Sequence, residues 1–242
     1  MVRGRYDRVM ANAPSTHTPK QGRDFTAEHY VETIFYIRFE EGPVRPGRLA
    51  HWMGVSAPSV TVALQRLERD GWLKIAGDRS VTLTDKGEEL AARIVRVHRL
   101  LERWLTDAMK LDWAVADEEA QLLAPGVSDR LADIIDEQLG RPQTCPHGNL
   151  IPGRKPPYGE LVALADLPAD QPAHIRRISE VAEHDAPDLL ADLRDYGLMT
   201  GTKISVAGGN SAAMDALSVR IGNETRPIGT AVARLIWVEP AT

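Results

Sequence analysis

The sequence predicts a mainly α-helical chain that ends in a small all-β module. Three observations support this fold class. From Thr26 to about Leu139, apolar residues recur at helical spacing, interrupted by a single hairpin pattern. Residues 141–159 are then dense in Pro and Gly, which is typical of a boundary between domains. From Glu160 onward, short alternating segments separated by turn residues indicate the strands of a small barrel.

The composition of the 242 residues narrows the class of protein. The formal net charge of −5 hides a division, because residues 1–99 carry 16 basic and 12 acidic side chains whereas residues 100–242 carry 13 and 22. A nucleic-acid contact is therefore favoured in the first part. No apolar run approaches the roughly 20 residues that cross a bilayer, and the single Cys excludes an internal disulfide framework. We expect a soluble cytoplasmic protein with no membrane contact.

Residues 26–88 are expected to form a winged helix-turn-helix domain, after a mobile tail at residues 1–25. Thr26 is a suitable N-cap for a first helix that ends before Glu40. A second helix, Pro46–Met53, turns tightly into a third, as a helix-turn-helix requires.

The third helix of this domain lies between Gly54 and Gly71. Ser56 is its natural N-cap, and Val60, Ala63, Leu64 and Leu67 form its apolar face. The opposite face carries small hydroxyl groups and no acidic residue in its N-terminal half, so it can approach phosphates and base edges without charge repulsion. Val62 stands where a polar contact residue is expected, and its alternative partner is a thymine methyl group.

A β-hairpin follows the third helix. Trp72–Ile75 and Ser80–Leu83 are its strands, and Arg79 lies in the polar turn at its tip. A hairpin in this position is a wing, whose tip reaches a phosphate or the minor groove; the alternative is a solvated hairpin arginine. The full set of expected DNA contacts is Arg45, Arg48, Ser56, Pro58, Ser59, Thr61, Val62, Gln65, Arg66 and Arg79.

Residues 89–141 are expected to form a helical dimerisation and metal-sensing domain. A long helix runs from Thr84 to about Lys110, with an apolar stripe too extensive for one small domain to cover. A twofold homodimer is the commonest way to cover such a stripe. Two further helices are expected, at about Asp117–Ala124 and Ser128–Leu139.

Residues 142–158 are interpreted as a linker, and residues 159–242 as the barrel. Its expected strands lie in ELVALADLP, AHIRRISEV, KISVAGG, LSVRIGNETRPI and AVARLIWVEP. One helix is expected at Pro187–Tyr196, and Gly208 and Gly209 are expected to form a turn and not a phosphate-binding loop.

The sequence resembles the diphtheria-toxin-repressor-like family of iron- and manganese-dependent transcription regulators. The resemblance is carried by TAEHYVETIFYI, APSVTVALQRLERDGWL, DRSVTLTDKG, VHRLLERWL, VSDRL and CPHGNLIPG, and it covers Thr26 to about Gly153. The segments LRDYGLMTGTKISV and GTAVARLIWV look like the SH3-like barrel of ferrous-iron-transport accessory proteins. The resemblance implies a homodimer whose winged helices bind a palindromic operator in double-stranded DNA when a divalent metal is bound, repressing metal-uptake genes.

The resemblance also implies metal ligands, but the first site departs from the family pattern. His29 and Glu32 occupy ligand positions on the first helix. The remaining principal ligands would fall on Gln121, Ala124 and Pro125, and Ala and Pro carry no donor atom. His29 and Glu32 alone are expected to hold an ion only weakly, and their other interpretation is a helix-terminal residue and a surface acid.

A second family metal position is better preserved. It falls on His98 and Glu102, one turn apart on the long helix, together with Asp117. One imidazole and two carboxylates suit Mn(II), Fe(II) or Zn(II), whereas the alternative is a surface hydrogen bond. The barrel is expected to contribute further ligands, and the candidates are Glu183, His184, Asp185 and Asp188.

Cys145 and His147 form a third constellation, in the sequence TCPHG. They supply half of a tetrahedral zinc or sensor site. Because the family carries this turn at the domain boundary, a structural role is the favoured interpretation.

The leading function hypothesis is therefore a dimeric DNA-binding regulator of manganese or iron homeostasis, acting as a repressor. The alternatives are a metal-independent winged-helix regulator that senses another signal, and a protein adaptor that binds through the barrel. An enzyme is not expected, because no HExxH or comparable catalytic motif is present.

Overall fold

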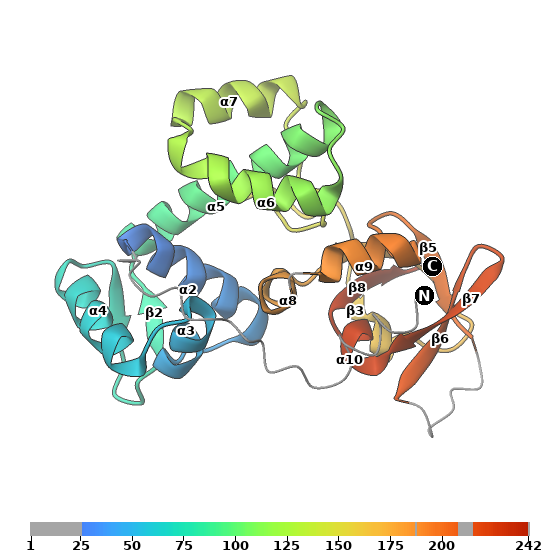
Figure 1. Ribbon diagram of the computed structural model, residues 1–242, viewed down its shortest axis with the longest axis horizontal. Coiled ribbons are helices and arrows are strands. Elements are labelled where there is room, and N and C mark those ends of the chain that lie inside the picture. Colours follow the sequence, from blue (N-terminus) through green and yellow to red (C-terminus); the bar gives the residue numbers. More distant parts are fainter. Residues whose placement is uncertain (1–25, 187, 208–214, 242) are drawn as a thin grey trace. The chain divides into compact units, whose positions relative to one another are not determined.

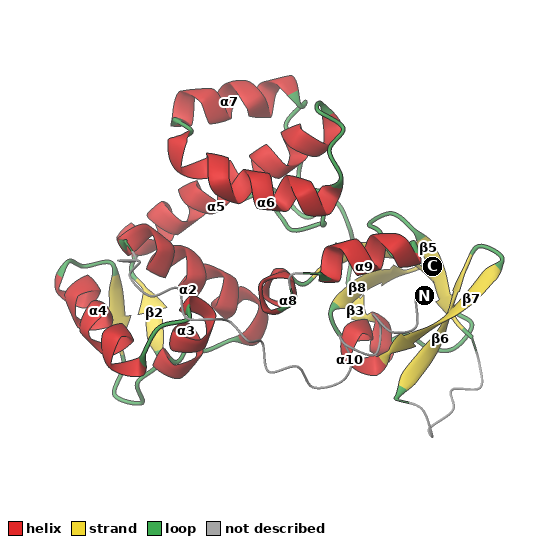
Figure 2. Ribbon diagram, viewed as in Figure 1, coloured by secondary structure: helices red, strands yellow, loops and turns green. Residues whose placement is uncertain are grey.

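The computed structural model describes residues 26–186, 188–207 and 215–241. They form two compact units that divide between His98 and Arg99. Helices dominate the chain up to residue 138 and strands dominate it after residue 162, as Figures 1 and 2 show. The predicted fold class is confirmed. The predicted mobile tail at residues 1–25 lies outside the described residues.

The first unit contains the predicted helix-turn-helix. Its helices are α2 (Ala27–Glu41), α3 (Pro46–Met53) and α4 (Ala57–Arg69). Helix α2 continues through Glu40 and Glu41, past the predicted end, and stops where Gly42 adopts a φ of 88°. Their buried faces form the core of the unit, which includes Tyr30, Val31, Ile34, Ile37, Leu49, Val60, Leu64 and Leu67.

The wing follows α4 as predicted. Strands β1 (Leu73–Ile75) and β2 (Val81–Leu83) pair antiparallel, with Leu73 opposite Leu83 and Ile75 opposite Val81. Helix α5 (Asp85–Asp107) begins directly after β2 and continues into the second unit. Gly87 lies against the carbonyl of Trp72, where a Cβ atom would stand 2.1 Å from the oxygen, so this residue must be glycine for the helix to start here.

Two shorter helices follow α5 in the second unit. They are α6 (Trp113–Leu123) and α7 (Asp129–Gln138), with a 3₁₀ turn at Ala124–Gly126 between them. Helix α6 begins earlier than predicted, because the Asp112 side chain caps it by accepting from the backbone N–H of Ala114 at 3.1 Å. Trp113, in its first turn, is buried in the core of the barrel and donates from Nε1 to the carbonyl of Leu190 at 3.0 Å.

The C-terminal barrel is a six-stranded antiparallel sheet in the order β3-β8-β4-β5-β6-β7. Its strands are β3 (Val162–Ala163), β4 (Pro172–Ile178), β5 (Lys203–Val206), β6 (Ala216–Ile221), β7 (Glu224–Gly229) and β8 (Ile236–Pro240). A bulge between Ile175 and Arg177 bends β4, the strand that the linker crosses.

Short helices complete the barrel, and three of them correct the sequence prediction. They are η2 (Leu164–Asp166), α8 (Glu180–Asp185), α9 (Leu189–Tyr196) and α10 (Thr230–Ala233). ELVALADLP is a strand only at Val162–Ala163, because η2 follows directly. AHIRRISEV is not one strand, because β4 ends at Ile178 and α8 follows. AVARLIWVEP likewise begins in α10 before it becomes β8. Apolar runs this short do not distinguish a strand from a single buried helical turn. The predicted turn at Gly208 and Gly209, and the predicted helix start at Pro187, lie outside the described residues.

The length and hydropathy of the described helices also bear on membrane insertion. None of them is both long enough and apolar enough to span a membrane.

Candidate metal centre and DNA-binding helix

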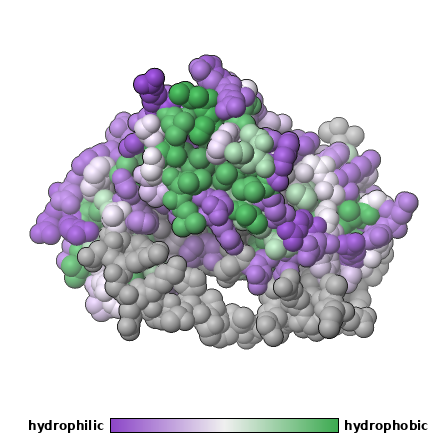
Figure 3. All heavy atoms as spheres, turned by 45° about the horizontal axis from the view of Figure 1, so that its top comes forward, coloured by the Kyte–Doolittle hydropathy of each residue, from purple (hydrophilic) through white to green (hydrophobic). Residues whose placement is uncertain are grey.

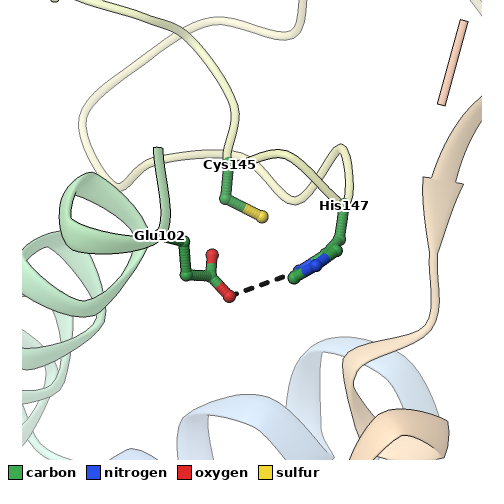
Figure 4. Close-up of side chains that lie close together, drawn as sticks. All are labelled: Glu102, Cys145 and His147. Carbon is green, nitrogen blue, oxygen red and sulfur yellow. Dashed lines mark ion pairs between the residues drawn. The ribbon is translucent and has the colours of Figure 1, made fainter. Parts of the chain in front are cut away.

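Three buried side chains that can ligate a metal converge in the second unit. Glu102 comes from α5, and Cys145 and His147 come from the linker (Figure 4). One ligand atom from each lies within 4.8 Å of the other two. The acid belongs to one element and the thiol and imidazole to another, so the group exists only in the folded chain.

The linker loop holds its shape through its own backbone. The N–H of Cys145 donates to the carbonyl of Asn149 at 2.9 Å, and the N–H of Gly148 donates to the carbonyl of Cys145 at 3.0 Å. Gly148 has a φ of +87°, and a Cβ atom there would lie 1.7 Å from the carbonyl oxygen of Arg176. Only glycine permits this approach to β4.

The barrel fixes the same loop from outside. The N–H of Ile178 donates to the carbonyl of His147 at 2.9 Å, and the hydroxyl of Thr200 donates to the carbonyl of Pro146 at 2.7 Å. The buried Arg99 of α5 pairs with Glu180 of α8 and donates to the carbonyl of Leu150. Helix α5, the linker and the barrel are thereby joined around the three ligating side chains.

The His147 ring is oriented as a metal ligand would be. Its Nε2 lies 3.3 Å from the carbonyl oxygen of Trp113, which can only accept, so Nε2 carries a proton and donates. Its Nδ1 lies 3.2 Å from Oε1 of Glu102. A neutral ring would then turn a lone pair toward a carboxylate, so a cation or a second ring proton belongs between them. Metal-bound histidines commonly donate their other nitrogen to a backbone carbonyl in this way.

The surroundings of Cys145 favour the uncharged thiol over the thiolate. Burial, and secondly the charge of Glu102, raise the pKa of this thiol to about 12. It therefore carries a proton at neutral pH, and a divalent ion would displace that proton and offset the charge of Glu102. Donor atoms that share one tetrahedral ion are about 3.3 Å apart, close to the Nδ1 to Oε1 separation of 3.2 Å. The residues present fit a divalent metal.

The predicted group of His98, Glu102 and Asp117 also comes together. His98 and Glu102 lie one turn apart on α5, and one ligand atom from each of the three lies within 4.8 Å of the others. Glu102 thus belongs to both groups. Sequence reasoning missed the second membership, because it weighed Cys145 and His147 as an isolated pair. The missing signal was an acid elsewhere in the chain that could complete the set.

The other predicted ligands are placed differently. The Nδ1 atom of His29 lies 2.8 Å from the hydroxyl oxygen of Thr26, and Glu32 accepts a hydrogen bond from the Tyr36 hydroxyl at 3.3 Å. Among the described residues, neither belongs to a group of three ligating side chains. In the barrel, Glu183, His184 and Asp185 fall in α8 and Asp188 precedes α9, and the side chains of Glu183 and Asp185 lie outside the described part.

The exposed face of α4 carries the predicted DNA contacts. Ser56 caps the helix by accepting from the N–H of Ser59 at 3.3 Å, and their hydroxyls lie 2.8 Å apart. The Thr61 hydroxyl donates to the carbonyl of Ala57 at 3.0 Å. Pro58, Val62, Gln65 and Arg66 are exposed on the same helix. Their assignment to DNA stays a prediction.

Two arginines among the predicted DNA contacts, Arg45 and Arg48, form ion pairs with acidic side chains. Arg45 pairs with Asp78 in the wing turn at 3.1 Å, and Arg48 contacts both carboxylate oxygens of Glu41 at 2.8 to 3.1 Å. Both pairs are partly exposed, so a phosphate oxygen can compete with either acid at small cost. Arg79 itself is exposed at the tip of the wing, with a φ of 66°.

Comparisons with known proteins match three segments of the chain to protein families. Residues 25–81 match the model described as iron dependent repressor, N-terminal DNA binding domain, and residues 84–153 match iron dependent repressor, metal binding and dimerisation domain. Residues 162–240 match the FeoA domain. The iron-dependent repressor IdeR of Mycobacterium tuberculosis is 37% identical over 198 residues, covering 75% of this chain and 83% of that protein.

The chain belongs to the diphtheria-toxin-repressor-like family. The diphtheria toxin repressor of Corynebacterium diphtheriae is 38% identical over 196 residues, covering 75% of this chain and 84% of that protein. A solved structure of a manganese-dependent transcriptional repressor in complex with manganese superposes with a TM-score of 0.78 at 30% identity, covering 89% of this chain and all of that one. The predicted resemblance is confirmed. Members of this family are DNA-binding, metal-dependent dimeric repressors and not enzymes.

The family's dimerisation region coincides with an exposed apolar surface. Figure 3 shows hydrophobic side chains gathered on one face of the molecule. Six of the nine exposed large hydrophobic residues in the described part lie on or beside α5, α6 and α7: Met109, Val115, Leu122, Leu123, Leu131 and Ile134. We call these six residues the apolar face. A surface of this kind is typical of a protein–protein interface.

The predicted contact of Arg79, at the tip of the wing, with a DNA phosphate can be tested. Arg79→Ala is expected to weaken binding to every DNA sequence about equally and to reduce the slope of log affinity against log salt by about one, because one phosphate contact is lost. Affinity measured over a salt series, for a specific and a random duplex, checks this. Arg234→Ala removes an exposed charge from the barrel and serves as the matched control. A change in sequence preference at constant salt slope would show that Arg79 reads bases instead.

Proposed function

We propose that this chain is a cytoplasmic homodimeric repressor of iron or manganese homeostasis that binds a palindromic DNA operator when a divalent ion occupies the centre at Glu102. The observation that carries the proposal is the convergence of Glu102, Cys145 and His147 at a buried position. A buried carboxylate, thiol and imidazole that lie this close together are donor types that bind divalent ions in proteins. A resident ion gives that carboxylate, the thiol and the imidazole one common role.

The donor set favours particular ions. The carboxylates and imidazole of the group formed by His98, Glu102 and Asp117 suit Mn(II) and Fe(II), whereas the sulfur of Cys145 favours Fe(II) or Zn(II). Because Glu102 is common to both groups, the sulfur-containing group makes Fe(II) a better fit than Mn(II). Binding through sulfur also releases the Cys145 proton, so affinity for the ion falls as pH is lowered.

Helix α5 supplies the route from ion to DNA. It begins at Asp85, directly after the wing strand β2, and carries Glu102 in a later turn. Its first turn is anchored in the DNA-binding unit by the pair of Arg38 with Glu88. An ion that fixes Glu102 to the linker therefore restrains the helix that follows the wing. Binding to DNA then costs less conformational entropy.

The test combines metal analysis with operator binding. Full-length protein loaded with Fe(II) without oxygen, Mn(II) or Zn(II) is assayed for bound metal and for affinity to an operator selected from random duplexes, with and without chelator. Cys145→Ser and His147→Ala are each expected to reduce ion affinity about 10- to 100-fold and to weaken metal-dependent operator binding. His174→Ala, which removes a barrel histidine outside both groups, is the control. Unchanged ion affinity in both variants would disprove the assignment.

A second candidate function is a repressor that binds its operator without metal. The observation in its favour is the donor-free Ala124 and Pro125 at positions where the family places ligands. The same assay separates the two candidates. Operator affinity that neither chelator nor any of the three ions alters would establish the metal-independent repressor.

A further inference from the structure

Helix α4, the reader helix that is predicted to contact DNA, carries an exposed apolar side chain at its centre. Val62 lies midway along α4 and is 68% exposed, whereas Val60, Leu64 and Leu67 are buried on the opposite face. Its neighbours one turn away in either direction, all exposed, are Pro58, Ser59, Gln65 and Arg66. Val62 is thus an exposed apolar residue at the centre of a face that is bordered by one proline, two polar side chains and one arginine.

Folding does not account for this residue. Val62 contributes nothing to the core, and a β-branched side chain in a helix interior is less favourable than Ala, Glu or Lys. Single exposed hydrophobic residues are common on protein surfaces, so the location of Val62 decides its meaning. In the described part of the DNA-binding unit, the other exposed large hydrophobic residue is Phe39, on α2. Val62 alone of the two stands on the helix that reads DNA.

The hydroxyl groups near Val62 are already engaged inside the helix. Thr61 donates to the carbonyl of Ala57, and Ser56 and Ser59 bond to each other at the N-terminus. At the middle of the exposed face, Val62 itself offers a partner only its two methyl groups. An apolar group placed against the donors and acceptors of a base edge leaves them unpaired at a cost. The major-groove edge of thymine is different, because it presents a C5-methyl group.

We propose that Val62 reads the C5-methyl group of a thymine in each half of the operator. This inference rests on the proposed function of DNA-binding repressor, and it names the base that the reader helix selects. Arg66 is exposed one turn further along α4 and can donate to a phosphate or to the electronegative edge of a neighbouring base. The thymine is consequently expected within the half-site and not in the spacer between the two halves.

The test removes methyl groups from DNA one at a time. After an operator has been selected from random duplexes with metal-loaded full-length protein, each thymine is replaced by 2′-deoxyuridine, which keeps the hydrogen-bonding pattern and loses only the methyl group. One position in each half-site is expected to lose about fourfold in affinity, and about 15-fold when both halves are changed. A scan in which no position responds overturns the proposal without any variant protein.

Variants then assign the responsive position to Val62. Val62→Ala is expected to bind the thymine and uracil operators equally, and Val62→Gln to select a different base there. Phe39→Ala, which shortens an exposed apolar side chain on another helix of the same domain, retains the discrimination. Circular dichroism verifies that each variant is folded. Discrimination that survives in Val62→Ala overturns the proposal, while failure of the unmodified protein to bind any duplex refutes the proposed function instead.

Discussion

Replacing Glu102 with Gln is expected to abolish the response of operator affinity to divalent metal. Glu102 is the one side chain shared by both ligating groups, so its loss leaves each of them with two ligands. The amide keeps the size of the side chain but carries no negative charge to balance the ion. We expect ion affinity to fall by at least about 100-fold and metal-loaded protein to bind the operator no better than metal-free protein.

The measurement is isothermal titration of the ion, together with operator affinity at saturating metal. Glu89→Gln removes an exposed acid from the same helix and controls for the change in net charge. Asp117→Asn and Cys145→Ser each damage only one of the two groups, so their separate effects show which group holds the ion that activates DNA binding. A metal response in Glu102→Gln as large as in the unmodified protein would place the activating ion elsewhere.

Local features of the chain could be predicted from the sequence alone. The apolar spacing of Val60, Leu64 and Leu67 and the cap at Ser56 determine α4 through contacts within a few residues. The wing followed in the same way from alternating residues on either side of a polar turn. The pair of His98 and Glu102 was predictable because both ligands lie on one helix, where spacing translates directly into position.

The remaining features depend on contacts between distant segments. Cys145 and His147 join Glu102 in a candidate metal centre only because the linker crosses β4 at Gly148 and meets α5. No periodicity in the sequence encodes that crossing. Helices α8 and α10 were missed because each is a short helix of one or two turns, whose apolar pattern does not distinguish it from a strand.

Introducing a charge into the apolar face is expected to convert the dimer into a monomer. Ile134, on α7, is 52% exposed, and Leu122, at the end of α6, is 75% exposed. In Ile134→Glu, dimerisation would bury an unpaired carboxylate, whose desolvation is far more costly than the loss of one apolar contact. Sedimentation equilibrium is expected to show a monomer at concentrations at which the unmodified protein is a dimer.

Operator binding is then expected to fall with dimerisation, because the proposed palindromic operator would be contacted by helix α4 of both protomers. Losing that linkage removes an avidity of about 10²- to 10⁴-fold, so we expect a loss of this order. Met199→Glu introduces the same charge at an exposed apolar residue of the barrel and controls for charge and solubility. The ligating groups at Glu102 come from one protomer, so ion affinity is expected to be preserved in Ile134→Glu. A variant that remains dimeric with unchanged operator affinity would exclude Ile134 from the dimer contact, whereas a monomer that also loses the ion would show that dimerisation builds the metal centre.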